Sequence, residues 1–248
     1  MRHVIITGAS RGIGKEMAIA LASNEVTLHL TARSELDELK KELENKGAKV
    51  CTYSFDLSET DRITELTKDI FGNIDFKDAS GVALINNAGM LHPMGPIGKH
   101  STSDYRKNLE VNFVAPVLLC QEFIQKTKDF SGMLRIVNVS SGAARKAYFG
   151  WSHYCATKAG LDRITEAVHL EHGDRIGCMG LNPGRTDTQM QTEIREQDED
   201  DFQLKQSFVD AYESGQLNDP KMVAQKSVTV LFSERFSAGK TVPVNDLQ

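Results

Sequence analysis

The amino-acid sequence predicts a doubly wound α/β fold: a three-layer sandwich in which a parallel seven-stranded sheet lies between helices. Two observations predict it. Short, nearly continuous apolar runs alternate with longer amphipathic stretches, and the first run leads directly into a glycine-rich turn. Strands that are buried on both faces read as continuous apolar runs, and alternating strands and helices give parallel pairing with right-handed crossovers. The 248 residues contain no internal repeat and no linker, so we expect one domain over 1–248.

Seven apolar runs of five to eight residues are the predicted strands, because their length and composition are those of buried strands. They are residues 3–7, 26–31, 49–55, 82–86, 135–140, 175–182 and 240–244. The amphipathic stretches between them are the predicted helices. These are residues 13–23, 35–46, 58–72, 103–128, 153–172 and 221–233.

One segment, 188–215, interrupts this alternation. It is polar and rich in acidic residues, and it follows the sixth strand. By charge alone it indicates a solvated helical hairpin. Ligands of open α/β sheets bind beyond the carboxyl ends of the strands, so a mobile lid over a substrate is an equally good interpretation. We call 188–215 the lid segment.

Composition and charge exclude several classes of function. The chain is 40% hydrophobic and 25% charged, as in an ordinary globular protein. Its 29 basic and 34 acidic residues give a net charge of −5, so nucleic acid and anionic membrane surfaces are not expected partners. No apolar run reaches the roughly 20 residues that would span a bilayer. The N-terminal apolar run leads into the glycine-rich turn and not into a cleavage site, so no signal peptide is expected.

The four cysteines are Cys51, Cys120, Cys155 and Cys178, and none has metal-ligand spacing. We expect reduced thiols in a cytoplasmic protein, with no metal site and no disulfide framework.

The first strand runs into Thr7-Gly8-Ala9-Ser10-Arg11-Gly12-Ile13-Gly14 and then a predicted helix. A glycine-rich turn at a helix N-terminus binds a pyrophosphate, because free backbone N–H groups and the helix dipole face the anion. Gly8 permits the tight turn, Gly12 lets the phosphates approach the backbone, and Gly14 lets the helix pack closely. The expected cofactor contacts here are Gly8, Ser10, Arg11, Gly12, Ile13 and Gly14.

The end of the second strand favours NADP(H) over NAD(H). An NAD site usually has an acidic residue there, about 20 residues beyond the glycine turn. This sequence has Thr31-Ala32-Arg33-Ser34, without a carboxylate. Arg33 would pair with a 2′-phosphate, which an acid would repel, and Arg11 adds a second cation. Either arginine alone could be an ordinary surface charge; together they favour NADP(H).

Two further strand ends are expected to meet the cofactor. Asp56 and Leu57 follow the third strand and should contact the adenine, although Asp56 could equally cap the next helix. The fourth strand ends in Asn86-Asn87-Ala88-Gly89, where small residues let the backbone lie against the cofactor. We expect contacts from Asn86, Ala88 and Gly89, although paired asparagines could instead form a turn.

Ser141, Tyr154 and Lys158 form the predicted catalytic group. Tyr154 and Lys158 are four residues apart in a helical pattern, so they share one face. A free tyrosine titrates at about pH 10. A nearby ammonium and an oxidised nicotinamide should lower this pKa, so that the phenol acts as general acid to a carbonyl oxygen receiving hydride. Ser141 would donate to the same oxygen. A Tyr–Lys pair at this spacing is often structural, but the serine and the upstream glycine turn favour catalysis.

Asn112 is a fourth candidate, in the predicted helix 103–128. Pro116 lacks an N–H group and leaves the carbonyl of Asn112 without its helical partner. That carbonyl could hold a water linked to Lys158, giving a proton path to Tyr154. The alternative is a tolerated kink with an exposed asparagine. His153, next to Tyr154, points about 100° away around the helix, so we expect it at the surface.

These features together resemble the short-chain dehydrogenase/reductase family over essentially the whole chain. The matching pieces are TGASRGIG, NNAG, Asn112, Ser141, Tyr154-x3-Lys158 and Asn182-Pro183-Gly184, with Thr188 shortly after. The resemblance implies a Rossmann-type sheet of strand order 3-2-1-4-5-6-7 and NADP(H) as cofactor. It implies catalytic roles for Asn112, Ser141, Tyr154 and Lys158, of which Tyr154 and Lys158 also contact the cofactor.

The same resemblance assigns the segment after the sixth strand. The backbone after Pro183 and Gly184, around Thr186, would hold the nicotinamide carboxamide, and Thr188 would hold the neighbouring phosphate. A homodimer or homotetramer is expected from the resemblance alone.

A narrower resemblance is to the sepiapterin reductases and the bacterial benzil reductases. It rests on Gly150-Trp151 ahead of Tyr154, on Asp187-Thr188-Gln189-Met190-Gln191, and on the C-terminal stretch that ends near Asp246. It implies that Asp246 anchors a pterin ring through paired hydrogen bonds, although Asp246 could also be a solvated tail residue. Val244-Asn245 stands where these families have an aromatic-rich tail. The expected substrate residues are Ser141, Trp151, Tyr154, Met190 and Asp246.

The sequence therefore predicts an NADPH-dependent carbonyl reductase that transfers hydride to a ketone or α-dicarbonyl, with Tyr154 as general acid. Its partner would be a small carbonyl substrate. The alternatives are a dehydrogenase of another small alcohol or ketone, an enoyl reductase and a non-catalytic NADP-binding sensor. Such sensors typically lack the tyrosine or the lysine, and enoyl reductases usually space the two more widely.

Overall fold

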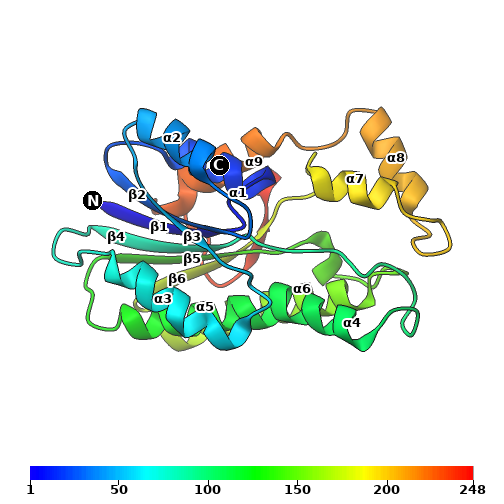
Figure 1. Cartoon of the computed structure of the whole chain (residues 1–248), viewed down its shortest axis with the longest axis horizontal. Coiled ribbons are helices and arrows are strands. Elements are labelled where there is room, and N and C mark those ends of the chain that lie inside the picture. The colour runs from blue at the N-terminus through cyan, green and yellow to red at the C-terminus, as the bar shows by residue number, and fades with distance from the viewer. Residues whose placement is uncertain (248) are drawn as a thin grey trace.

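The computed structural model describes residues 1–247 and contains one seven-stranded sheet (Figure 1). All its strands pair in parallel, in the order β3-β2-β1-β4-β5-β6-β7, as predicted. The strands are β1 (Arg2–Thr7), β2 (Val26–Ala32), β3 (Lys49–Ser54), β4 (Gly81–Asn86), β5 (Met133–Val139), β6 (Ile176–Asn182) and β7 (Thr241–Pro243). The order reverses between β1 and β4, and ligands of such sheets bind at this switch point, beyond the carboxyl ends of the strands.

Helices cover both faces of the sheet, in three layers (Figure 1). The first face carries α1 (Gly12–Leu21), α2 (Asp37–Asn45) and α9 (Pro220–Leu231), and the second carries α3 (Ile63–Gly72), α5 (Ala115–Lys126) and α6 (Ser152–His172). Side chains of β1 alternate between the layers: Val4 and Ile6 pack toward the first face, and Ile5 packs toward the second. The continuous apolar runs in the sequence follow from this two-sided burial.

The stretch predicted as one kinked helix over 103–128 is divided into three parts. It begins with α4 (Thr102–Leu109), passes through a π-helical segment over Glu110–Val114 and continues as α5. The N–H of Ala115 donates to the carbonyl of Glu110, five residues back. Pro116 therefore lies in the first turn of α5, where a missing N–H group costs little.

The lid segment folds into α7 (Gln189–Arg195) and α8 (Lys205–Glu213), which lie beyond the end of the sheet (Figure 1). Its connecting stretch is anchored by apolar side chains. Phe202 is fully buried, and Phe208 on α8 is 4% exposed. The segment is thus a helical hairpin, as the charge pattern indicated, but its apolar side chains pack against Trp151 and Tyr154. Its mobility as a lid stays a prediction.

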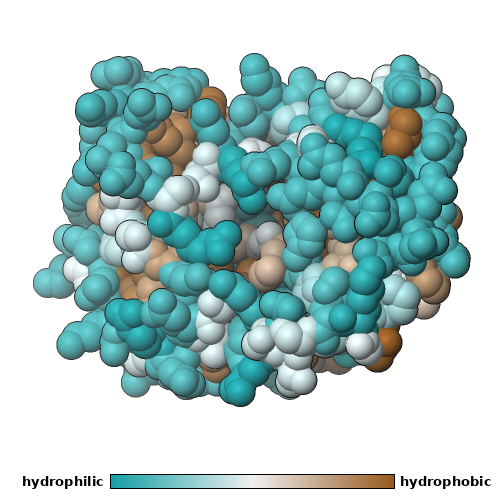
Figure 2. Space-filling view, turned by 45° about the vertical axis from the view of Figure 1, so that its right-hand side comes forward, coloured by the Kyte–Doolittle hydropathy of each residue, from teal (hydrophilic) through white to brown (hydrophobic). Residues whose placement is uncertain are grey.

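The face of the molecule shown in Figure 2 is largely polar. On the face shown in Figure 2, hydrophobic side chains appear only in small patches between hydrophilic ones. Within residues 1–247, no helix is both long enough and apolar enough to span a membrane. In the same residues, no group of His, Cys, Asp and Glu side chains is arranged to hold a metal ion.

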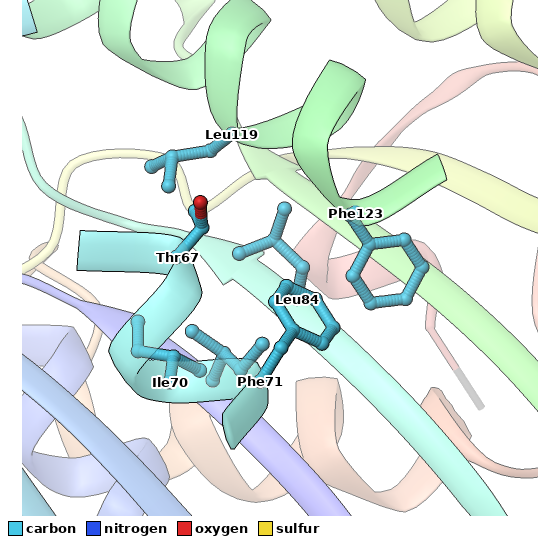
Figure 3. A pocket seen from close by; sticks show the side chains of 7 residues that line it. Thr67, Ile70, Phe71, Leu84, Leu119 and Phe123 are labelled. Atoms are coloured by element: carbon cyan, nitrogen blue, oxygen red, sulfur yellow. The ribbon is translucent and has the colours of Figure 1, made fainter. Parts of the chain in front are cut away.

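A small internal cavity lies between α3, α5 and the sheet (Figure 3). Its volume is about 10 Å³, close to the minimum for one water molecule. Apart from the hydroxyl of Thr67, its lining side chains are apolar: Ile5, Ile70, Phe71, Leu84, Leu119 and Phe123. The cavity is a packing defect of the core, too small for a substrate.

Candidate active site

The glycine turn after β1 is held against the exit of β4. Gly8 and Gly12 have φ angles of +67° and +56°, which side chains rarely adopt. A Cβ at Gly14 would lie 2.5 Å from the carbonyl oxygen of Gly8 and would clash with the Asn87 side chain. Asn87 Nδ2 donates to the carbonyls of Thr7 and Gly8, at 3.0 and 3.1 Å. The glycines are therefore required by backbone shape and by close packing.

The N-terminus of α1 fits an anion. Its N-cap residue, Arg11, makes no side-chain capping hydrogen bond, so the cap leaves the first-turn N–H groups without a side-chain acceptor. These donors and the turn around Gly12 form the cradle that a pyrophosphate requires. Ser10 and Ile13 lie in the same turn and are partly exposed.

Asn86 and Asn87 have different surroundings, although they are neighbours in the sequence. The expected cofactor contacts of Asn86, Ala88 and Gly89 stay predictions. The Asn86 side chain is 2% exposed and donates to Asn138 Oδ1 at 2.8 Å, so it lies in the core and only its backbone is left to face a cofactor. Asn87, which was not among the residues expected to contact the cofactor, positions the glycine turn. Thr7 Oγ1 accepts from the backbone N–H groups of Asn87 and Ala88. The asparagine pair at the end of β4 was the sequence signal for this role. It did not indicate which of the two side chains would hold the glycine turn.

Arg33 lies at the tip of β2, beside Asp56. Its guanidinium is 3.9 Å from Asp56 Oδ2, and Lys107 Nζ is 3.8 Å from the same oxygen. Burial favours the neutral form of Asp56, but hydrogen bonds from the N–H and hydroxyl of Ser58, with the charges of Lys107 and Arg33, outweigh it and lower the pKa of Asp56. Arg33 is 65% exposed, and its cationic side chain is accessible to a phosphate. Leu57 is buried.

The three predicted catalytic side chains come together at the end of β5. Tyr154 and Lys158 lie on the same side of α6, with Lys158 Nζ 5.7 Å from the centre of the Tyr154 ring. Lys158 Nζ also donates to the carbonyl of Val139 at 2.8 Å, which ties α6 to the end of β5. Ser141 follows two residues later, and its Oγ accepts from Ala143 N at 3.1 Å. That leaves the Ser141 hydroxyl proton free to donate elsewhere.

Burial sets the protonation of this group. It raises the pKa of Tyr154 to about 12, and a hydrogen bond with Ser141 offsets it only in part. Burial also lowers the pKa of Lys158 to about 8, against the charge of Asp162. Both side chains are about 95% buried, and desolvation is the largest cause of both shifts. The predicted lowering of the Tyr154 pKa refers to the site with an oxidised nicotinamide bound and stays a prediction.

Asn112 lies in the π-helical segment and packs beside the catalytic group. A Cβ at Gly89 would lie 3.3 Å from Asn112 Oδ1 and 3.7 Å from Lys158 Nζ, so these three residues adjoin. The Asn112 side chain bonds both backbone groups of Met90. Asn108 is a further positioning residue that sequence reasoning missed: its Nδ2 lies within 3.3 Å of three successive carbonyls, those of residues 90–92.

The loop after β6 closes the other side of the site. Gly184 has a φ of +69°, and Thr186 Oγ1 donates to the carbonyl of Pro183. Asn218, which the sequence analysis did not single out, donates to the same carbonyl and pairs with the backbone around Thr186. Thr188 then reaches the glycine turn, because its methyl group would lie 3.4 Å from a Cβ at Gly12. The two segments expected to hold phosphate are thus in contact.

An aromatic cluster surrounds Tyr154. Trp151 stacks on Phe202 at 4.4 Å between ring centres and meets Tyr154 edge-on at 5.6 Å. Phe208 also meets Trp151 edge-on, at 5.6 Å, and Met190 packs against the cluster. The lid segment therefore contributes Phe202, Phe208 and Met190 to the apolar surroundings of the catalytic group.

Two predicted placements need comment. His153 is buried, at 8% exposure, and packs edge-on against Tyr105 of α4, so the expected surface position is wrong. His153 is buried because α4 packs on α6 and covers that side of the helix. Asp246 is exposed, and its neighbours Val244 and Leu247 pack into the core beside α9, not into the aromatic cluster. Its role as an anchor stays a prediction.

Comparison with known proteins now gives the family. The sequence profile of the family described as short chain dehydrogenase matches residues 2–199. The chain belongs to this family. It is therefore an oxidoreductase of a family that uses a nicotinamide dinucleotide.

Several members of this family are similar over almost their whole length. A benzil reductase ((S)-benzoin forming) of Bacillus cereus is 34% identical, covering 99% of this chain and 100% of that protein. A sepiapterin reductase of Bos taurus is 29% identical, covering 98% and 94%. A crystal structure of a family member from Saccharomyces cerevisiae has a TM-score of 0.83 at 23% identity, covering 99% and 97% of the two chains, which supports the fold alone.

Proposed function

We propose that the protein is an NADPH-dependent carbonyl reductase that reduces an aromatic ketone or α-dicarbonyl, with Tyr154 as general acid. The observation that carries the proposal is the convergence of Ser141, Tyr154 and Lys158 beside an aromatic cluster. The similarity to benzil and sepiapterin reductases agrees with it.

The residues of the chain divide the chemistry among them. A reduced nicotinamide, when bound, supplies hydride to the carbonyl carbon. Tyr154 donates its phenolic proton to the carbonyl oxygen as negative charge develops there. Ser141 donates a second hydrogen bond to the same oxygen, since its own Oγ already accepts from Ala143 N. With a pKa of about 12, Tyr154 holds its proton throughout the neutral range.

Lys158 stabilises the phenolate that remains after the transfer. Its ammonium lies 5.7 Å from the ring centre and is present below about pH 8, so reduction should weaken as the pH rises through this value. Its neighbour Asn112 holds the backbone of Met90 and keeps the loop after β4 in place. We propose that this region conducts the replacement proton from solvent to Tyr154.

The aromatic cluster supports a diketone more than a pterin as substrate. Trp151, Phe202 and Phe208 are nearly fully buried and make the surroundings of the proton donor aromatic and apolar. A pterin would also need a polar anchor for its amino-pyrimidine ring, and Asp246 lies exposed next to apolar residues that pack elsewhere. An aromatic α-dicarbonyl such as benzil needs no such anchor.

The proposal is tested by NADPH oxidation with benzil, sepiapterin, a simple aldehyde and an enoyl thioester. We expect kcat/KM to be highest for benzil and no turnover of the enoyl thioester. Asp246→Ala, assayed in parallel, is expected to leave benzil reduction unchanged. Loss of sepiapterin turnover alone in this variant would support the pterin anchor. Turnover of the thioester in place of the carbonyl compounds would overturn the proposal.

Arg33→Asp tests the cofactor separately. The carboxylate would repel a 2′-phosphate and would bind ribose hydroxyls instead. We expect the ratio of kcat/KM with NADPH to that with NADH to fall at least about tenfold, the scale of one charge-assisted hydrogen bond. Arg62→Asp is the matched control, because it makes the same charge change at an exposed arginine that directly precedes α3. An unchanged ratio would show that Arg33 does not select the cofactor.

A further inference from the structure

The lid segment is tied to the glycine turn through Arg11. Its guanidinium donates to Gln189 Oε1, and a second guanidinium nitrogen lies 4.0 Å from Glu193 Oε1. Gln189 and Glu193 are four residues apart on α7, so they face Arg11 from successive turns of one helix. Arg11, which is 178 residues away from Gln189 in the sequence, thus meets two side chains of the lid segment.

The two elements joined by Arg11 are those proposed to hold the cofactor phosphates. A Cβ built at Gly12 would lie 3.4 Å from the methyl group of Thr188, so the glycine turn and the residue before α7 are close neighbours there. Arg11 extends this contact at the exposed edge, where its side chain is 61% accessible. At that edge Arg11 is available to an anion from solvent as well as to the lid.

The carboxylate of Glu193 opposes an anion at this position. It lies within ion-pair distance of Arg11, so its charge repels an anion that binds there. A 2′-phosphate that binds Arg11 must displace the amide of Gln189 and approach the carboxylate of Glu193. Both effects reduce the free energy gained from the arginine.

We propose that Glu193 and Gln189 are specificity-determining residues that compete with the 2′-phosphate of NADP(H) for Arg11 and so moderate the preference for NADP(H) over NAD(H). The inference rests on the proposed function, NADPH-dependent reduction, and on the expectation from the sequence that Arg11 is a second cation for the 2′-phosphate. In this inference, the lid segment also sets how much Arg11 contributes to the affinity for NADP(H).

The test measures binding and not turnover. Dissociation constants of NADP⁺ and NAD⁺ are determined by isothermal titration calorimetry for the wild type, Glu193→Gln and Gln189→Ala. We expect Glu193→Gln to tighten NADP⁺ binding about three- to fivefold, the range of an exposed ion pair, and to leave NAD⁺ binding unchanged. Gln189→Ala should act in the same direction. In an Arg11→Ala background the gain should disappear, because the shared partner is gone.

The matched control is Glu196→Gln, which removes an exposed lid carboxylate just beyond α7; within residues 1–247, the ion pair of Arg11 is with Glu193 and not with Glu196. It should leave both dissociation constants as they are. If Glu196→Gln tightens NADP⁺ binding as much as Glu193→Gln does, the effect is one of general lid charge and the inference is wrong. It is also wrong if Glu193→Gln changes the two affinities equally or changes neither.

A second measurement separates this inference from the proposed function. Hydrogen exchange of the α7 amides in the cofactor-free protein should become faster in Arg11→Ala and stay unchanged in Arg33→Ala, because Arg33 lies beside Asp56 and not beside the lid. Unchanged exchange in Arg11→Ala would overturn the contact between lid and turn. Equal affinity of the wild type for NADP⁺ and NAD⁺ would instead overturn the proposed cofactor preference.

Discussion

Tyr154→Phe is expected to lower kcat/KM for benzil at least about a hundredfold, the scale of a lost general acid. The substitution removes only the hydroxyl. The ring that meets Trp151 edge-on is retained, so the aromatic cluster and the fold should be preserved. Without the phenolic proton, the carbonyl oxygen keeps only the hydrogen bond from Ser141. The measurement is steady-state NADPH oxidation, with the thermal midpoint as the check on folding.

Tyr212→Phe is the matched control for this experiment. Tyr212 lies on α8, is half exposed and is remote in sequence from the catalytic group. Its loss of a hydroxyl should leave kcat/KM within about twofold, as expected for a surface substitution. If Tyr154→Phe keeps more than a tenth of the wild-type activity, another group donates the proton and the mechanism proposed here fails.

The second large effect is a loss of stability in mild acid, caused by His29. This side chain is fully buried on β2, where Nε2 lies 3.1 Å from His3 Nδ1 and Nδ1 lies 3.1 Å from the hydroxyl of Tyr53. Burial, the charge of His3 and the charge of Lys49 lower its pKa to about 3. The imidazole is therefore neutral in the folded protein throughout the neutral and mildly acidic range.

The direction of the pH effect follows from proton linkage. Between the folded pKa of about 3 and the unfolded value of about 6.5, the unfolded chain binds more protons, so stability falls as the pH decreases. Each pH unit contributes about 1.4 kcal/mol, and the whole interval contributes at most about 4 to 5 kcal/mol. His3, whose pKa burial also lowers, adds to the effect in the same direction. Urea unfolding at pH 7.0, 6.0 and 5.0 measures it.

His29→Gln distinguishes the contribution of His29 to the pH dependence of stability from that of the other titratable groups. The amide does not titrate, so the fall in unfolding free energy between pH 7 and pH 5 should become shallower, even if the variant is less stable at pH 7. His172→Gln, at the partly exposed end of α6, is the control and should keep the wild-type slope. Equal slopes in all three proteins would show that His29 does not couple stability to pH.

The parallel strands and the Tyr154–Lys158 pair were predictable from sequence for a local reason, whereas the strand order came from the family resemblance. Two-sided burial makes each strand of a parallel sheet a continuous apolar run, and the four-residue spacing of Tyr154 and Lys158 places them on one helix face. The glycine turn was predictable for a similar reason, because glycine readily adopts the positive φ angles found at positions 8 and 12 and other residues rarely do.

Other parts of the site depend on contacts between distant segments, which local patterns do not contain. Asn86 and Asn87 are adjacent and chemically identical, yet one lies in the core and the other holds the glycine turn. His153 is buried because α4 packs over it. Asn108 acts on a loop that precedes it by more than fifteen residues. Such roles follow from how helices and loops are placed around the sheet.

By itself, the sequence determined the doubly wound sheet, the glycine turn and a tyrosine and lysine on one helical face, because backbone periodicity and glycine's conformational range act over a few residues. The tertiary structure decided which side chains are desolvated and which are paired. Burial beside β5 raises the pKa of Tyr154 although a lysine lies one turn away, and folding brings the lid to Arg11. Both depend on neighbours that only the packed chain supplies.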